Sequence, residues 1–204
     1  TVLHQHGWES VKNSDYDDHY YRQWMHELPP LRHRLRGTVV DVHHTILPTT
    51  SRLNPDPDQL IAASRSLPGT PFRIFAPTDM VLHSAAHAFH DGELANPLRD
   101  LLDLHELLSY FDTHESDFWD TLPQRARQLH LDRPLFYGLR YAQRFLGTSV
   151  PAIVTHALQS SAPFWPVRVF MDRLVTTIML AESLHSIGVV AARWLLYVRS
   201  HWLR

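Results

Sequence analysis

Apolar residues at helical spacing dominate the second half of the chain. Leucines recur every three or four positions over residues 101–108, the pattern of an amphipathic helix with one buried face. An apolar stretch precedes it, and Pro77 suits the first turn of a helix, where its missing N–H costs nothing. The pattern therefore predicts a helical hairpin over residues 77–108, whose connection lies around residues 91–93.

The same spacing predicts further helices after the hairpin. Gly147 is a stop signal for one of them, because glycine tolerates the left-handed conformation in which many helices end. The expected helical segments are residues 117–129, 134–146, 151–159 and a long pair within 167–203. The last helix combines Trp194 and Trp202 with arginines, so we expect it to cover the core or a protein partner.

β-branched residues mark the best strand of the chain. Residues 39–47 alternate in polarity and end at Pro48, which predicts a strand with Asp41 and His43 on one face. The aromatic run at residues 15–25 predicts a second strand or hairpin arm.

Turn signals separate the two halves of the chain. Short helices are expected before Gly7 and within the proline-rich stretch at residues 58–65. The sequence thus predicts an α+β protein, with an α/β portion over residues 1–71 and a mainly helical portion over residues 72–204.

Composition excludes some classes of protein. The 204 residues include no cysteine, which rules out disulfides, thiolate metal ligands and a cysteine nucleophile. A formal net charge of −2 gives no strong nucleic-acid signal. The longest apolar run, residues 187–198, contains Arg193 and is too short to span a membrane. We expect a soluble, cytoplasmic protein without a transmembrane segment.

Three histidines share one face of the first hairpin helix. His83, His87 and His90 lie four and three residues apart, close enough for their rings to approach one another. They are either structural or ligands of a zinc or iron ion, and three nearby carboxylates could complete such a site: Asp91, Asp100 and Asp103. We expect the structural role, with His87 the most buried.

Carboxylates are the other candidate ligands. Asp41 on a rigid strand suits a hard cation such as magnesium, although a solvated aspartate on an edge strand gives the same pattern. The pairs Asp15/Asp17 and Asp56/Asp58 follow no glycine-rich turn, so we interpret them as unrelated to a site. Motifs of dinucleotide-binding, P-loop and serine-hydrolase proteins are absent.

Five short segments, in order along roughly the first 110 residues, carry a family resemblance. They are Gly7-Trp8, His26-Glu27-Leu28-Pro29-Pro30-Leu31, Val39-Val40-Asp41-Val42-His43-His44, residues 76–87 and Leu101-Leu102-Asp103-Leu104. Together they resemble the uncharacterised nucleotidyltransferase-like family of the DNA polymerase beta type superfamily. That resemblance implies a small mixed sheet on which an Asp-x-Asp pair and a third carboxylate hold magnesium and a nucleoside triphosphate.

The resemblance assigns roles to particular residues. Asp41 matches the third carboxylate and would be both catalytic and a magnesium ligand, and His43 would contact the nucleotide cofactor. The Gly-Ser turn and the Asp-x-Asp pair should precede Gly7, so we expect this chain alone to be incomplete or inactive. Two alternatives stay open: a metal-dependent phosphohydrolase of the HD type built around His90-Asp91, and a non-catalytic helical interaction module.

Overall fold

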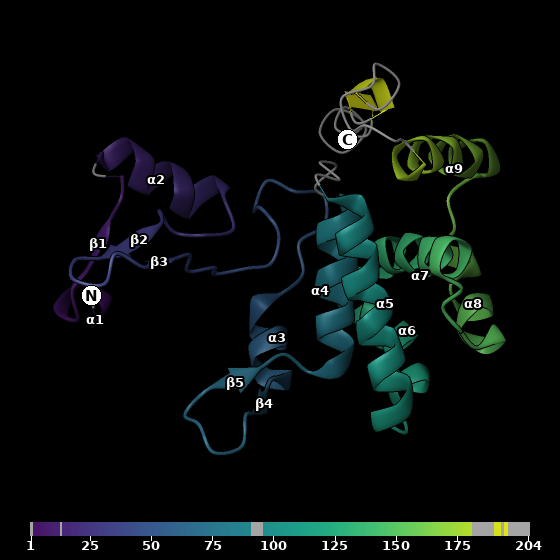
Figure 1. The fold of residues 1–204 in the computed structure, drawn as a ribbon, viewed down its shortest axis with the longest axis horizontal. Coiled ribbons are helices and arrows are strands. Elements are labelled where there is room, and N and C mark those ends of the chain that lie inside the picture. Colours follow the sequence, from purple (N-terminus) through teal and green to yellow (C-terminus); the bar gives the residue numbers. More distant parts are fainter. Residues whose placement is uncertain (1, 13, 91–95, 181–189, 193, 196–204) are drawn as a thin grey trace. The chain divides into compact units, whose positions relative to one another are not determined.

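The computed structural model describes residues 2–12, 14–90, 96–180, 190–192 and 194–195, with the backbone alone for Asp15 and His90. The chain forms two compact units, Thr1–Pro57 and Asp58–Arg204 (Figure 1). Small antiparallel sheets come first and a mainly helical region follows, so the predicted α+β class is confirmed. The boundary between the two units follows Pro57, earlier in the chain than the boundary expected after residue 71. The extent of each functional domain stays a prediction.

A three-stranded antiparallel sheet organises the N-terminal unit. Its elements are α1 (Val2–Gln5), β1 (Trp8–Ser10), α2 (Asp15–Trp24), β2 (Leu31–His33) and β3 (Val39–Val40). The strand order is β1-β2-β3. Gly7 has a φ of +82°, so the glycine expected after the first helix adopts the left-handed conformation.

The strand predicted over residues 15–25 is wrong, because this segment is the helix α2. Ser14 caps it by accepting a hydrogen bond from the Asp17 N–H at 3.0 Å. The aromatic residues stand four apart, and the Tyr16–Tyr20 and Tyr20–Trp24 ring centroids are 6.2 and 5.5 Å apart. Aromatic side chains at this spacing follow a helical face, which an expectation of alternating strand positions overlooks.

The strand predicted over residues 39–47 is also longer than the observed one. β3 ends at Val40, and beyond it only an isolated bridge joins His43 to Glu27 among the described residues. The opposing segment contains Pro29 and Pro30, which have no N–H to donate to a strand ladder. Regular pairing therefore stops where the chain passes the two prolines.

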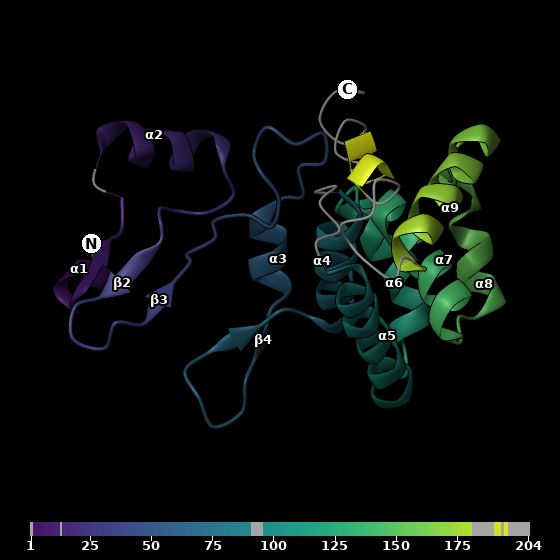
Figure 2. The same ribbon diagram turned by 45° about the horizontal axis from the view of Figure 1, so that its top comes forward.

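Helices make up most of the C-terminal unit. Its elements are α3 (Pro57–Ala63), the hairpin β4 (Arg65–Ser66) and β5 (Arg73–Ile74), α4 (Pro77–His90), α5 (Pro97–His114), α6 (Phe118–Gln128), α7 (Asp132–Leu146), α8 (Ala152–Ala157), the 3-10 helix η1 (Gln159–Ser161) and α9 (Trp165–Met179). The expected helical hairpin is thus confirmed as α4 and α5. Figures 1 and 2 both show α7, α8 and α9 on the side of this hairpin away from α3.

The core of this unit lies where α7 crosses α4 and α5. Leu101, Leu104 and Leu108 are buried, which confirms the predicted apolar stripe of α5. Gly138 allows the close crossing, because a Cβ atom there would lie 2.9 Å from Leu104 Cδ2 and 3.3 Å from Ala85 Cβ.

The helix predicted at the C-terminal end lies mostly outside the described residues. Residues 190–192 and 194–195 are helical, and Trp194 is exposed. Among the helices that the structure describes, none has the length and apolar character needed to cross a membrane.

Candidate functional site

Two segments of the N-terminal unit run antiparallel with a change of register. The pairs Leu31–Val40 and Glu27–His43 flank a stretch in which three residues on one segment face two on the other. On the far side of the two prolines from β2, the segments are again hydrogen-bonded, since the Leu28 N–H donates to the Val42 carbonyl at 2.8 Å. One segment therefore has one more residue than the other between these two pairs, and we call this irregular stretch the bulge.

Asp41 lies at this bulge, at the point where regular pairing stops. It is exposed, and within the described part of the chain its carboxylate has no hydrogen-bond or ion-pair partner. An exposed carboxylate without a partner is available to a ligand, and its oxygens suit magnesium. Its position agrees with a solvated setting, whereas its catalytic and magnesium-binding roles stay predictions.

The bridge next to Asp41 brings three potential metal ligands together. One ligand atom from each of His26, Glu27 and His43 lies within 4.8 Å of the other two. His43 Nε2 is 3.5 Å from Glu27 Oε2, and the two imidazole rings have centroids 4.9 Å apart. Backbone hydrogen bonds hold the segments, because the His44 N–H donates to the His26 carbonyl at 2.9 Å.

The chemistry of this cluster differs from that of a magnesium site. Two imidazoles and one carboxylate suit zinc, iron or manganese, whereas magnesium prefers oxygen ligands. His26 and Glu27 are half-buried and His43 is exposed, so an ion has access from solvent. His43 was predicted to contact the nucleotide. His26 and Glu27 were missed as ligands, although their segment carries part of the family resemblance.

The histidine face of α4 is only partly described. The rings of His83 and His87 stack with centroids 6.2 Å apart and planes 8° apart. His83 is half-buried beside Phe75, whereas His87 is exposed, so the expectation that His87 is the most buried is wrong. The His90 side chain and Asp91 lie outside the described residues, and a metal site on this face stays a prediction.

Two further carboxylates were expected near these histidines. Burial raises the pKa of Asp100, and the attraction of His87 partly offsets this effect. The two side chains therefore interact. Asp103 is exposed, and its carboxylate lies 3.9 Å from the Arg99 guanidinium, so the two residues form an ion pair on the surface of α5.

Neither pair of nearby aspartates forms the expected Asp-x-Asp site. Asp15 and Asp17 lie on α2, and Asp17 accepts a hydrogen bond from the Ser14 hydroxyl. Asp56 and Asp58 flank the first residue of α3. Both pairs therefore lie outside the strands, and their interpretation as unrelated to a site stays a prediction.

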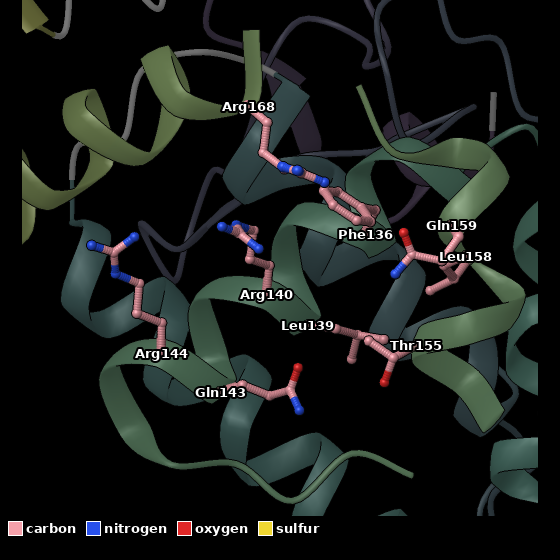
Figure 3. Close-up of a pocket in the computed structure, with 9 residues that line it drawn as sticks. All are labelled: Phe136, Leu139, Arg140, Gln143, Arg144, Thr155, Leu158, Gln159 and Arg168. Atoms are coloured by element: carbon pink, nitrogen blue, oxygen red, sulfur yellow. The ribbon is translucent and has the colours of Figure 1, made fainter. Parts of the chain in front are cut away.

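A pocket of about 450 Å³ lies in the C-terminal unit, between α7, α8, η1 and α9 (Figure 3). Its lining includes the guanidinium groups of Arg140, Arg144 and Arg168. Sequence analysis missed it, because helices from different parts of the chain contribute its residues. Arg140 and Arg144, four residues apart on one helix, gave the only local indication of the pocket in the sequence.

The family of the chain follows from a comparison with family models. The model described as "Uncharacterised nucleotidyltransferase" matches residues 1–147, nearly three quarters of the sequence. No curated protein and no solved structure matches it. The match contains all five segments of the resemblance, both units up to the end of α7, and the bulge at Asp41. The chain belongs to the uncharacterised nucleotidyltransferase family.

Proposed function

We propose that this protein takes part in magnesium-dependent nucleotidyl transfer and that Asp41 is one of its metal-binding carboxylates. The observation that carries the proposal is the family match, which covers the bulge where Asp41 is exposed and unpaired within the described chain. The match favours this function over the phosphohydrolase and interaction-module alternatives. The doublet on which the former depends, His90-Asp91, is not described.

Two residues around the bulge would contact different parts of the ligand: Asp41 through its carboxylate oxygens and His43 through its ring nitrogens. Asp41 would hold magnesium, which when bound neutralises triphosphate charge and orients the reacting phosphate. His43 lies two residues further on and can donate a hydrogen bond from its ring to a phosphate oxygen. Glu27 Oε2 lies 3.5 Å from His43 Nε2 and would help to orient the imidazole toward a nucleotide.

Nucleotidyl transfer needs more than one carboxylate. Charge develops on both the attacking and the leaving oxygen, and two metal ions are required to stabilise it. Among the residues that the structure describes, Asp41 is the carboxylate that would correspond to those of the family's strands, because the close aspartate pairs lie on or beside helices. We therefore expect residues 1–204 to bind magnesium-nucleoside triphosphate weakly and to catalyse no transfer without a further pair of carboxylates.

Equilibrium titration with each nucleoside triphosphate, followed by nuclear magnetic resonance, tests this proposal. With magnesium present, the resonances of residues 39–44 should shift, and the shifts should disappear with EDTA or in Asp41→Asn. Asp120→Asn is the matched control, because Asp120 is an exposed aspartate far along the sequence. Shifts that persist in Asp41→Asn, or that need no magnesium, would exclude Asp41 as the metal ligand.

A further inference from the structure

We propose that the pocket between α7, α8, η1 and α9 binds a small phosphomonoester with an apolar organic portion. Figure 3 shows side chains from all four elements around the same space, with Arg140 and Arg144 from α7 and Arg168 from α9. The proposal concerns the C-terminal unit and is independent of nucleotidyl transfer at Asp41.

The charge of the pocket favours a doubly negative ligand. Arg140 donates from Nε and Nη2 to the two carboxylate oxygens of Asp172 at 2.8 and 2.6 Å. Arg144 Nη1 is 3.7 Å from the same carboxylate. Arg140 and Arg144 thus share one carboxylate, and together with the guanidinium of Arg168 they leave a net charge of about +2 at the pocket.

Arg168 is the guanidinium most available to a ligand. Across the residues that the structure describes, its side chain has no ion-pair partner, although it is half-buried at the pocket. A phosphomonoester carries about −1.5 to −2 charges at pH 7, whereas a simple carboxylate carries one. Arginine also donates in a fork that matches phosphate oxygens. The charge balance therefore favours phosphate over carboxylate.

Asp172 pre-organises the phosphate-facing side of the pocket. Its two hydrogen bonds hold the planar end of Arg140, so little rotamer freedom remains to be lost on binding. Hydrogen bonding from Arg140 lowers the pKa of Asp172, which stays ionised at neutral pH. We assign Asp172 as a positioning residue, since it acts through Arg140.

The remaining lining suits the organic portion of the ligand. Apolar surface comes from Phe136, Leu139 and Leu158, and three polar side chains complete the wall: Gln143, Thr155 and Gln159. The volume of about 450 Å³ lies in the range of small-molecule pockets, roughly 300–1,000 Å³. Inorganic phosphate would leave most of this space unfilled, so an organic phosphate should bind more tightly.

The pocket lies at the edge of the region shared with the family. Thr155, Leu158, Gln159 and Arg168 follow residue 147, where the family match ends. The segment from α8 to α9 therefore supplies about half of the lining, including Arg168. A pocket built in this way adds a ligand site to the family portion of the chain.

Isothermal titration calorimetry with four probes tests the proposal: phenyl phosphate, AMP, inorganic phosphate and benzoate. Phenyl phosphate or AMP should bind more tightly than inorganic phosphate and benzoate. The tighter of the two identifies the organic portion as a simple aromatic group or a nucleoside. Arg168→Gln should weaken this binding about tenfold or more, the effect expected for a lost charged hydrogen bond.

Arg173→Gln is the matched control, because Arg173 is exposed on the same helix and does not line the pocket. Arg168→Gln leaves the Arg140–Asp172 pair intact, so its melting temperature should equal that of the control. A second variant, Asp172→Asn, should lower the affinity for the phosphate probes, because Arg140 loses the residue that positions it, and benzoate binding should stay weak. Equal binding of phosphate and benzoate probes, or equal effects of Arg168→Gln and Arg173→Gln, would overturn the proposal.

Discussion

The fully buried carboxylate of Asp79 accepts two hydrogen bonds from the guanidinium of Arg125, at 2.7 and 2.8 Å. Asp79 lies in the first turn of α4 and Arg125 on α6, so this pair joins two helices of the C-terminal unit. Arg125 also donates to the Gln59 carbonyl on α3 at 2.9 Å. Asp79 therefore connects α4 to α6 and, through Arg125, to α3.

We expect Arg125→Ala to destabilise the protein by about 3–5 kcal/mol, because it leaves a buried carboxylate without its partner. The free energy of unfolding, measured in urea, checks this value. Arg133→Ala is the control, since Arg133 is exposed in the same unit. If both variants unfold at the same urea concentration, the pair does not stabilise the fold. The double variant Asp79→Leu/Arg125→Met should recover part of the loss, because it removes both charges.

Gly138→Val should destabilise the crossing of α7 with α4 and α5. The added atoms meet Leu104 and Ala85, and overpacking of this kind costs about 1–3 kcal/mol even though valine is a better helix former than glycine. Thermal unfolding measures the loss. Ala152→Val, at an exposed position of α8, is the control and should change the melting temperature little. An unchanged melting temperature in Gly138→Val would mean that the helices do not cross closely there.

The His26–Glu27–His43 cluster should bind one equivalent of zinc or manganese. We expect His43→Ala to weaken metal binding more than about tenfold, because the loss of a ligand should lower the affinity more than the loss of a residue that supports a ligand. The affinity should also fall in acid, because an imidazole binds a metal ion only in its neutral form. Metal analysis after dialysis and competition titrations measure both effects.

His44→Ala is the control for this metal site, because His44 is exposed next to His43 and is not part of the cluster. Metal that is retained in His43→Ala and lost in His87→Ala would instead place the ion on the histidine face of α4.

The pair of Asp172 with Arg140 should make stability depend on pH. Hydrogen bonding from Arg140 lowers the pKa of Asp172 below its ordinary value of 3.8. The pair therefore contributes stability above about pH 4, and this contribution is lost as the pH falls through the lowered pKa of the folded state. At pH 7, Asp172→Asn should lose about 1–3 kcal/mol, as for hydrogen bonds to charged groups, and the loss should shrink in acid.

Urea unfolding of Asp172→Asn at pH 7 and pH 3 measures this difference. Asp103→Asn serves as the control, because its contact with Arg99 at 3.9 Å is on the surface, and such pairs contribute little. A loss in Asp172→Asn that is the same at both pH values would show that the ion pair is not its cause.

Helices could be predicted from the sequence because their hydrogen bonds and side-chain contacts are local. The repeat of leucines over residues 101–108, Pro77 and the stop at Gly147 each act within a few residues, and α4, α5 and α7 lie where these signals place them. α2 carried equally local signals in Ser14 and in aromatic residues four apart. Its aromatic composition favours a strand, whereas the four-residue spacing and the Ser14 cap match the observed helix.

Strands and sites depend on which distant segments meet, and local patterns do not contain that information. The extent of β3 was decided by the two prolines on the opposing segment, and the same pairing brings His26 and Glu27 to His43. The family resemblance indicates Asp41 as a candidate site residue, but its place at the bulge required the register of both segments. The arginine pocket depended on the tertiary structure, because Arg168 on α9 and Arg140 on α7 are distant in the sequence and line the same space, where the Arg140–Asp172 pair joins the two helices.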